Sequence, residues 1–340
     1  MSQALDPAGV LTIEREGVYC PEGKFFIDPR IPVDRAIITH AHSDHARPGS
    51  KHYLTSQRGL GVLKERVGYG SPSFQTLGYG EQLQINGVTL SLHPSGHLLG
   101  ASQVRIERQG YTCVVTGDYK RQPDSSCDPF EIVSCNSFFT ECTFGLPVYS
   151  WPTVESVQYE IHNWWRKNQE QGITSVLFAY ALGKAQRILA VLDDSIGPIG
   201  VHGSIEKFDP HYKAAGISLA EHSKVTPENR SEFTGRGLII APGSTAGSPW
   251  LRKFSPMSLA FASGWMQIRG SRRRQALDRG FVLSDHVDWN QLHQTIYETG
   301  AEFVGTMHGF TSVVTQYLNE TGIRSIEVGS LRDRDEAEED

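Results

Sequence analysis

Residues 35–45 of the chain read Arg-Ala-Ile-Ile-Thr-His-Ala-His-Ser-Asp-His. The first half is typical of a short buried strand, and the second half holds four potential metal ligands, His40, His42, Asp44 and His45. Imidazole and carboxylate ligands suit zinc, manganese or iron, and a cluster this dense suits a hydrolytic site with two metal ions. A solvated turn is the alternative, but chance clustering of this kind is rare, so we expect a metal site.

The direction in which each ligand points depends on the backbone of this loop. Side chains alternate between two faces in an extended segment. His40, His42 and Asp44 would therefore converge on one side only if the loop remains extended. His45 would then point elsewhere, which favours a second metal ion over a fourth ligand to the first.

The bulk composition is that of a globular protein with a sizeable core. The chain has 340 residues, of which 39% are hydrophobic, so we expect one large domain or two of ordinary size. It contains no apolar run of the ~20 residues that a membrane span needs, and no signal-peptide pattern at its start. Its five cysteines form no Cys-x-x-Cys pair, which favours free thiols and a cytoplasmic location.

The net charge of −6 argues against a protein coated in basic surface. Nucleic acid would have to be bound locally, in a positively charged groove. The dense basic run of the chain consists of Arg269, Arg272, Arg273, Arg274 and Arg279. This run would suit such a groove, and a solvated helix face is the alternative.

Several short apolar segments run directly into a residue that could act chemically. They are residues 90–92 before His97, 112–116 before Asp118, 137–140 before Glu141, 281–283 before His286 and 303–306 before His308. The carboxyl ends of strands are where layered α/β sheets collect their ligands. We therefore expect these residues to converge on the metal cluster.

The middle of the chain follows a strand–turn–helix pattern instead. Its segments are a helix at 154–168, a strand at 174–180, a helix at 184–192, a strand at 238–241 and a helical start near residue 249. Such repeats predict a parallel sheet covered by helices, here as a second α/β unit inserted into the chain. Trp164 and Trp165 in the first helix are expected to pack in the core rather than to stack on bases.

The motifs resemble a known superfamily. The cluster at 40–45, the Ser-Gly-His97-x-x-Gly-Ala segment and the Thr-Gly-Asp118-Tyr segment resemble the metallo-β-lactamase superfamily. Four later segments resemble motifs of the β-CASP nucleases, a group within this superfamily. They are Glu141-Cys-Thr-Phe-Gly, Phe178-Ala-Tyr-Ala-Leu-Gly-Lys-Ala-Gln-Arg, Ser284-Asp-His286-Val-Asp and Met307-His308-Gly. Tyr19-Cys-Pro-Glu-Gly, Asp28-Pro-Arg and Gly117-Asp-Tyr-Lys-Arg-Gln-Pro-Asp look like the bacterial ligase-associated DNA damage response exonucleases. The similarity covers nearly the whole chain.

The resemblance implies an α/β protein, an αββα metallo-β-lactamase sandwich with an inserted β-CASP-like cap domain. The sandwich would be formed by residues 1–149 and 276–331, and the cap by residues 150–275. Residues 332–340 would form a disordered acidic tail.

The resemblance also assigns seven side chains to two divalent metal ions, zinc or manganese. The first ion would be held by His40, His42 and His97, the second by Asp44, His45 and His308, and Asp118 would bridge the two. This division agrees with the separate direction expected for His45.

Phosphodiester hydrolysis needs an activated water, charge stabilisation on the phosphate and a proton for the leaving oxygen. Two metal ions ~3.5–4 Å apart can supply the first two by sharing a hydroxide. His286 is the candidate general acid, oriented by Glu141, whose negative charge would raise the pKa of His286. We expect His286, Glu141, Asp44 and Asp118 to take part in catalysis; a supporting role for the His286–Glu141 pair behind the metal ligands is the alternative.

Substrate contacts are expected at the turn before the helix at 184–192. This turn would aim Gly183, the helix N-terminus and the Lys184 amine outward, toward a phosphate. A solvated helix-start lysine is the alternative for Lys184. Arg269, Arg272 and Arg273 would contact the nucleic-acid backbone.

The resemblance favours DNA over RNA as the substrate and a functional association with an ATP-dependent DNA ligase and a helicase. An RNA-processing ribonuclease is the closest alternative, because His308 stands where DNA-specific eukaryotic β-CASP enzymes usually carry valine. A thioesterase-type hydrolase would share the metal cluster but would not explain the inserted segment. A catalytically inactive scaffold would have lost ligands, and none is missing here.

Overall fold

The structure is a computed structural model that describes residues 3–70, 72–268 and 277–328. The chain divides into two compact units. Unit 1 is built from Met1–Ser150 and His286–Glu339, and unit 2 from Trp151–Asp285. Because unit 2 is continuous in sequence, it interrupts the chain of unit 1 once.

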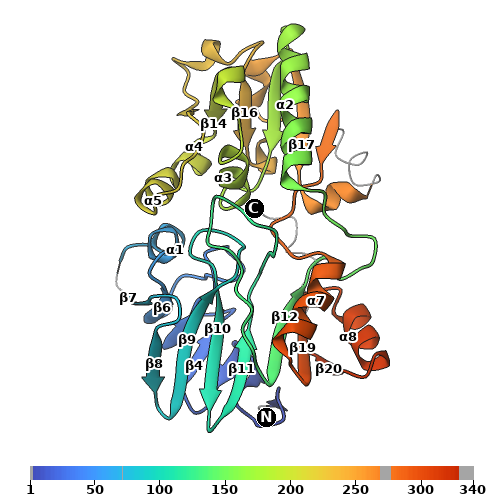
Figure 1. The fold of residues 1–340 in the computed structure, drawn as a ribbon. Coiled ribbons are helices and arrows are strands. Elements are labelled where there is room, and N and C mark those ends of the chain that lie inside the picture. The colour runs from blue at the N-terminus through green and yellow to red at the C-terminus, as the bar shows by residue number, and fades with distance from the viewer. Residues whose placement is uncertain (1–2, 71, 269–276, 329–340) are drawn as a thin grey trace. The chain divides into compact units, whose positions relative to one another are not determined.

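Unit 1 contains two seven-stranded sheets (Figure 1). The first has its strands in chain order: β1 (Gln3–Ala4), β2 (Thr12–Glu14), β3 (Gly17–Cys20), β4 (Phe25–Ile27), β5 (Arg35–Ile37), β6 (His52–Ser56) and β7 (Ser73–Leu77). The second has the order β20 (Arg324–Glu327), β19 (Phe303–Gly309), β12 (Ser137–Cys142), β11 (Tyr111–Val115), β10 (Ser102–Arg108), β9 (Val88–Pro94) and β8 (Gln82–Ile85). Strands β12 and β19 are parallel neighbours, so unit 2 enters the chain between two adjacent strands.

The two sheets of unit 1 pack face to face on one apolar core. Phe25 and Leu54 from the first sheet share this core with Val104 and Phe139 from the second, and all four are buried. Side chains alternate faces along a strand, so each sheet gives one face to this interior. Burial of this apolar surface is the main force that holds the sandwich together.

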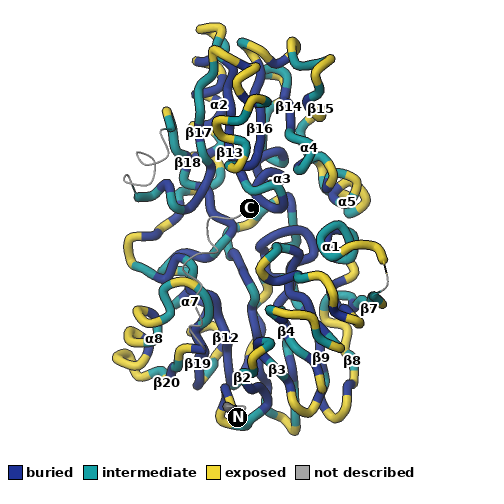
Figure 2. Tube along the Cα trace, turned by 180° about the vertical axis from the view of Figure 1, so that it is seen from behind, coloured by how far each residue is buried: buried dark blue, intermediate teal, exposed yellow. Residues whose placement is uncertain are grey.

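Helices cover the outer face of the second sheet. Leu292 of α7 (Trp289–Thr299) and Val314 of α8 (Thr311–Glu320) pack with Val114 and the other outward-facing residues of this sheet. Figure 2 shows the strands mostly buried and the solvent side of both helices exposed. Beside the first sheet, α1 (Leu60–Val67) places the Lys64 ammonium over the Phe74 ring of β7.

Unit 2 is built on a six-stranded sheet whose paired strands are all parallel. Its order is β15 (Ser223–Lys224), β14 (Ile199–Val201), β16 (Leu238–Ala241), β13 (Thr174–Phe178), β17 (Met257–Ala262) and β18 (Arg279–Phe281). The α-helices among its described residues are α2 (Val154–Glu170), α3 (Lys184–Leu189), α4 (Gly203–Glu206) and α5 (Asp209–Ala214). The predicted parallel, helix-covered sheet is confirmed, but the helix expected near residue 249 is only a short 3₁₀ turn, Leu251–Phe254.

The pattern of α2 explains how it packs. Thr153 caps its N-terminus by accepting a hydrogen bond from the Ser156 amide. Val157, Ile161, Trp164 and Trp165 recur at helical spacing and are buried, as expected for the two tryptophans. The amphipathic face of this helix therefore supplies a large part of the core of unit 2.

The boundary at which the chain leaves unit 2 differs from the predicted one. The expected cap ended at residue 275, whereas the compact unit ends at Asp285. The reason is β18, which pairs in parallel with β17 and so belongs to the sheet of unit 2. The expected acidic tail at 332–340 lies outside the described residues.

Chemically capable residues lie where strands of unit 1 end. His40 follows β5, His97 follows β9 and Asp118 follows β11, while Glu141 and His308 lie in the last residues of β12 and β19. Because β11, β12 and β19 are parallel neighbours, their carboxyl ends share one edge of the sheet. None of the helices in the described part of the chain has the length and hydrophobicity needed to cross a lipid bilayer.

A close backbone approach holds the loop that carries His97. Gly100 has a φ of +76°, and a Cβ atom there would lie 2.1 Å from the Cα of Gly59. The Ser56 hydroxyl also donates a 2.6 Å hydrogen bond to the Gly100 carbonyl. Only glycine satisfies both the backbone angle and the contact.

We predict that Gly100→Ala lowers the free energy of unfolding by about 3 kcal/mol or more, because strain and a backbone clash add. Gly110→Ala is the matched control: its φ is +81°, but no atom lies within 4 Å of the added Cβ. That control should lose only about 1–2 kcal/mol. Urea denaturation followed by circular dichroism measures both, and equal losses would contradict the proposed contact.

Candidate metal centre

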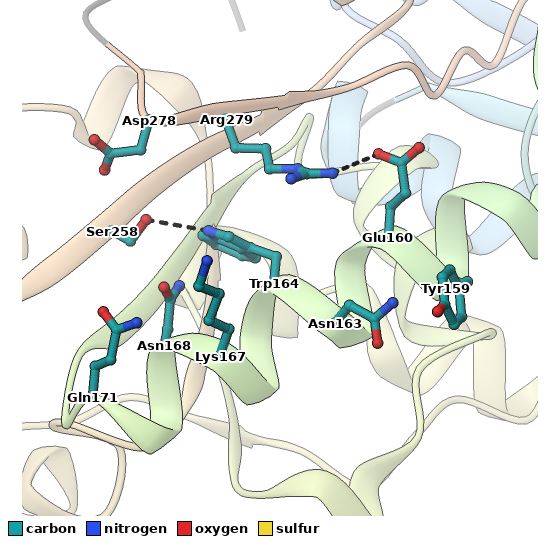
Figure 3. A pocket seen from close by; sticks show the side chains of 10 residues that line it. All are labelled: Tyr159, Glu160, Asn163, Trp164, Lys167, Asn168, Gln171, Ser258, Asp278 and Arg279. Carbon is teal, nitrogen blue, oxygen red and sulfur yellow. Dashed lines mark hydrogen bonds and ion pairs between the residues drawn. The ribbon is translucent and has the colours of Figure 1, made fainter.

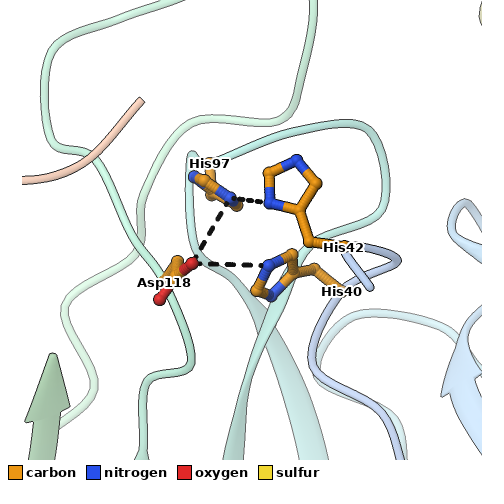
Figure 4. A group of neighbouring side chains, drawn as sticks. All are labelled: His40, His42, His97 and Asp118. Atoms are coloured by element: carbon orange, nitrogen blue, oxygen red, sulfur yellow. Dashed lines mark hydrogen bonds and ion pairs between the residues drawn. The ribbon is translucent and has the colours of Figure 1, made fainter. Parts of the chain in front are cut away.

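Four of the predicted ligands form one compact group (Figure 4). Asp118 Oδ2 lies 3.4 Å from His40 Nε2 and 3.7 Å from His97 Nε2. His97 Nε2 lies 3.1 Å from His42 Nδ1. One ligand atom from each residue lies within 4.8 Å of the others, a set of three imidazoles and one carboxylate that suits zinc.

The remaining predicted ligands gather around His45, which also lies next to Asp118. His45 Nε2 lies 3.5 Å from Asp118 Oδ2 and 3.5 Å from Asp44 Oδ2. The rings of His45 and His308 are 5.3 Å apart. Asp118 is thus adjacent to both groups, as a bridging carboxylate would be.

The loop that carries these ligands is turned rather than extended. The amides of His45 and Ala46 both donate to the His42 carbonyl, at 3.2 and 2.8 Å. The alternation of faces considered for an extended loop therefore does not apply, and Asp44 pairs with His45 instead of joining His40 and His42. The turn brings the His45 ring to 4.1 Å from the His40 ring, and Asp118 Oδ2 lies next to both.

The protonation of this group is set by burial and by mutual charge. Burial and the neighbouring imidazoles lower the pKa of His40 well below its usual value, so this ligand is neutral. Burial lowers the pKa of His45, but the carboxylates of Asp44 and Asp118 outweigh it and raise that pKa well above its usual value. Burial raises the pKa of Asp118 to about 7. A bound cation would displace these protons and take over the charge compensation.

The structure itself supports a fit between these residues and a metal ion. His40 is only 3% exposed, and its Nε2 atom is buried without a hydrogen-bond partner among the described residues. A buried nitrogen in this position is unfavourable unless it is satisfied by another group. Its neighbours are further imidazoles and a carboxylate, which are the donors that zinc and manganese use.

The backbone is distorted to present His308. Strand register shifts at the end of β12, where Glu141 pairs with Met307 but Cys142 pairs with Gly309. His308 is the extra residue of this bulge and has a φ of +54°. Bulges redirect side chains, and a positive φ in a residue other than glycine is unfavourable and is enriched at functional sites. Local strain is thus tolerated to aim this imidazole at His45.

Asp28 is a supporting residue to which sequence reasoning gave no role. Its Oδ2 lies 2.8 Å from His45 Nδ1 and accepts from the Thr39 hydroxyl at 2.5 Å, while its Oδ1 accepts from the Thr39 amide at 2.8 Å. Its φ is +44°. A carboxylate on Nδ1 fixes the imidazole tautomer and turns Nε2 toward the metal position. The Asp28-Pro-Arg motif was the available signal, but its contact partners were not visible in the sequence.

His286 and Glu141 form a hydrogen-bonded pair beside the metal cluster. His286 Nδ1 donates to Glu141 Oε2 at 2.7 Å, and the Tyr119 amide donates to Glu141 Oε1 at 2.9 Å. Burial raises the pKa of Glu141, but His286 outweighs burial and holds it below its usual value, so the carboxylate is ionised. The His286 ring lies 5.0 Å from the His97 ring. The other ring nitrogen, Nε2, therefore faces away from the carboxylate.

The predicted outward direction of Lys184 and Gly183 is wrong. Lys184 is 3% exposed, and its Nζ lies 3.1 Å from Asp285 Oδ2. The Gly183 amide donates to Gln186 Oε1 at 2.8 Å, so it is already bonded within its own turn. The physical reason is that α3 is buried along its whole length, which leaves its first residues no path to solvent.

Of the arginines predicted to line a basic groove, the structure describes Arg279. Arg269, Arg272, Arg273 and Arg274 lie outside the described residues. Arg279 is described, and its guanidinium lies 2.9 Å from Glu160 on α2.

A hollow of about 550 Å³ beside α2 is lined by Arg279, Lys167 and Trp164 among others (Figure 3). Trp164 Nε1 donates a 3.2 Å hydrogen bond to the Ser258 hydroxyl there, which fixes the indole ring in the wall of the hollow.

Comparisons with known proteins agree with this geometry. Over 321 residues the chain is 29% identical to a probable DNA ligase from Opitutus terrae, a match that covers 92% of this chain and 30% of that protein. It is 29% identical over 143 residues to the endoribonuclease YSH1 from Yarrowia lipolytica, covering 42% of this chain and 17% of that protein. No protein-family model matches the chain.

The fold also has a counterpart among solved structures. A crystal structure of a protein of unknown function from Enterococcus faecalis matches with a TM-score of 0.58 and 10% identity, over 87% of this chain and 79% of that one. The chain spans less than a third of the length of the two curated relatives named above. The relatives confirm the predicted resemblance to ligase-associated β-CASP nucleases of the metallo-β-lactamase superfamily.

We predict that His97→Asn lowers the zinc content of the purified protein by about one ion per chain, because the first group loses one of its three imidazoles. His93→Asn is the matched control, since His93 is bonded to Glu131 and Ser91 outside the cluster. Metal analysis after dialysis measures both variants. Unchanged zinc in the His97 variant would exclude this residue as a ligand.

Asp28→Asn should weaken zinc binding by about 10–100-fold, because the amide removes the charge that orients His45. Asparagine has nearly the same shape and tolerates a positive φ, so the backbone should be retained. Competition with a chelator measures the affinity. Asp34→Asn, which removes a surface partner of Lys51, should leave it unchanged, and equal affinities in all three proteins would refute the role of Asp28.

Proposed function

We propose that the chain is a metal-dependent nuclease that hydrolyses phosphodiester bonds in DNA and acts as an exonuclease in DNA repair. In this proposal unit 1 is a metallo-β-lactamase sandwich and unit 2 is a β-CASP-like cap. Support comes from the similarity to a probable DNA ligase along 92% of the chain, and from the His/Asp cluster at the strand ends of unit 1.

The observation that carries this proposal is the His286–Glu141 pair next to the cluster. Asp118, Glu141 and His286 each offer an atom within 4.8 Å of the others. An alkoxide is a poor leaving group, and a positioned acid accelerates its departure by ~10²–10⁴-fold. A thiolate leaves easily without a proton, so a thioesterase would have little use for this pair.

The residues of the chain would divide the reaction among them. Two bound divalent ions, zinc or manganese, would activate the attacking water and neutralise charge on the phosphate. His40, His42 and His97 would hold one, Asp44, His45 and His308 the other, and Asp118 would contact both. Water attacks phosphorus as the bond from phosphorus to the 3′ or 5′ oxygen breaks.

His286 would donate the proton that the leaving oxygen needs, from Nε2. Glu141 remains ionised throughout, stabilises the protonated imidazole and holds its ring in place. His286 regains its proton from solvent before the next turnover. A buried carboxylate that accepts hydrogen bonds from His286 and from the Tyr119 amide is well suited to this task.

DNA is favoured over RNA because the similarity to the ligase spans both units, while that to the endoribonuclease spans 42% of the chain. An RNA-processing nuclease is the second candidate, favoured by the endoribonuclease relatives and by His308. Association with an ATP-dependent ligase is proposed because one protein named as a ligase contains a region similar to nearly this entire chain. Arg269, Arg272 and Arg273 remain proposed contacts to the nucleic-acid backbone, and association with a helicase is proposed from the resemblance alone.

We predict that His286→Ala lowers the rate of polynucleotide cleavage by at least about 100-fold while the metal content stays close to that of the unchanged protein. Asp118→Ala should lose metal and activity together, since it touches both groups of ligands. His293→Ala, on α7 away from the cluster, is the control and should retain both. Loss of metal in the His286 variant would leave that residue a structural role only.

Digestion of end-labelled single- and double-stranded DNA and RNA with zinc, manganese or magnesium tests the proposed substrate. Cleavage of DNA at a higher rate than RNA is the expected result. Cleavage of RNA alone would replace the proposal by its second candidate. Hydrolysis of a small activated ester without cleavage of any polynucleotide would point to a small-molecule hydrolase.

A further inference from the structure

Unit 2 contains a buried cluster of charges that the mechanism above does not use. Lys184 and Arg187 lie on α3, and Asp285 is the residue at which the chain leaves the unit. All three side chains are 2–3% exposed. Two cations thus share one carboxylate in the interior.

The two cations contact both the backbone and a side chain of residues 284–285. Asp285 Oδ2 lies 3.1 Å from Lys184 Nζ, and Asp285 Oδ1 lies 3.3 Å from Arg187 Nη1. Arg187 Nη1 also donates a 2.6 Å hydrogen bond to the Ser284 carbonyl. Residues 284 and 285 are therefore tied to one helix by the main chain and by a carboxylate.

The helix that supplies the two cations is itself immobilised. Each residue of α3 is buried, and the Gln186 side chain closes its first turn by accepting from the Gly183 amide and donating to the Ala181 carbonyl. Lys184 Nζ also lies 4.5 Å above the Tyr180 ring, a cation–π contact. The cations are thus held at defined positions.

Such a cluster is a costly way to stabilise a fold. Charges removed from water lose hydration that their mutual attraction recovers only in part, and apolar residues of similar volume often stabilise as well or better. Burial accordingly lowers the pKa of Lys184, although Asp285 opposes the shift. A role in fixing the position of the neighbouring backbone accounts better for this arrangement than a contribution to the stability of the fold.

The chain passes from Asp285 directly to His286. We propose that Lys184, Arg187 and Asp285 form a positioning cluster, which fixes the backbone at 284–285 and thereby the placement of the acid His286. The inference rests on the proposed function, because it takes His286 as the proton donor. The three residues do not touch the substrate; they act through the histidine.

Two substrates with different leaving groups separate positioning from general support of the fold. A DNA strand leaves as an alkoxide and needs the proton from His286, whereas bis(p-nitrophenyl) phosphate releases a weakly basic phenolate that needs none. Asp285→Asn should lower kcat for DNA by about 10–100-fold, since small misplacements of a catalytic group have effects of this size. The KM for DNA, the zinc content and the rate on bis(p-nitrophenyl) phosphate should change less than about twofold.

The control is another contact of a carboxylate with a basic side chain in unit 2, remote in sequence from His286. Asp209 Oδ2 lies 2.8 Å from His222 Nε2, and Asp209→Asn should leave both rates unchanged. Equal rates on DNA for the Asp285 variant and the unchanged protein would overturn the inference. So would a parallel loss on both substrates, which would assign the cluster a purely structural role.

Arg187→Met provides the second variant if Asp285→Asn does not fold. It removes the donor to the Ser284 carbonyl and leaves Lys184 and Asp285 as a pair of opposite charges, so its interior is better compensated. The same selective loss on DNA is expected. Absence of DNA cleavage by the unchanged protein would count against the proposed function itself, whereas cleavage that the variants retain in full would count against the positioning cluster alone.

Discussion

The Asp118 carboxylate is the interaction on which the centre of unit 1 depends. Its Oδ2 atom lies 3.4–3.7 Å from the Nε2 atoms of His40, His45 and His97. His40 and His45 share the loop after β5, and His97 lies in the loop after β9. These loops follow strands of both sheets, so the two layers of the sandwich meet at one carboxylate. Without a cation, three buried imidazoles and a carboxylate would have to share protons, and the raised pKa of Asp118 and the lowered pKa of His40 express that conflict. A bound divalent cation would resolve it, because it would satisfy the nitrogen and oxygen atoms together.

Strain near this centre is concentrated where ligands must be aimed. Asp28 and His308 both have positive φ angles, and both place a polar group next to His45. The bulge at the end of β19 shifts its register against β12 by one residue, and this shift sets the direction of His308. The close contact between Gly100 and Gly59 restrains the loop that carries His97. Regular strands therefore bring the ligand-bearing segments together, and irregular backbone decides their final directions.

Much of the centre was predictable because its information is local. A buried strand followed by a ligand is visible in a few residues, and parallel strands force such ends to one edge of a sheet. The turn after His42 was not predictable from face alternation, which assumes an extended chain. The sequence predicts an outward Lys184 because a lysine at a helix start is usually solvated, whereas its partner Asp285 is far along the chain. Asp28 was missed for the same reason, since Thr39 and His45 become its partners only in the folded structure.

The place at which unit 2 interrupts unit 1 has a physical logic. Strands β12 and β19 are parallel neighbours, so the chain between them must cross over one face of the sheet, and α7 alone can provide that crossover. Extra residues at the start of a crossover leave the strand register unchanged. The crossover begins at the carboxyl end of β12, which carries Glu141, and resumes at His286 just before α7. A segment inserted there begins ten residues after Glu141 and ends directly before His286, the two residues of the proposed acid pair. In the proposed function, changes in that segment would alter how the substrate is bound and how His286 is held, while the proposed metal ligands of unit 1 would remain in place.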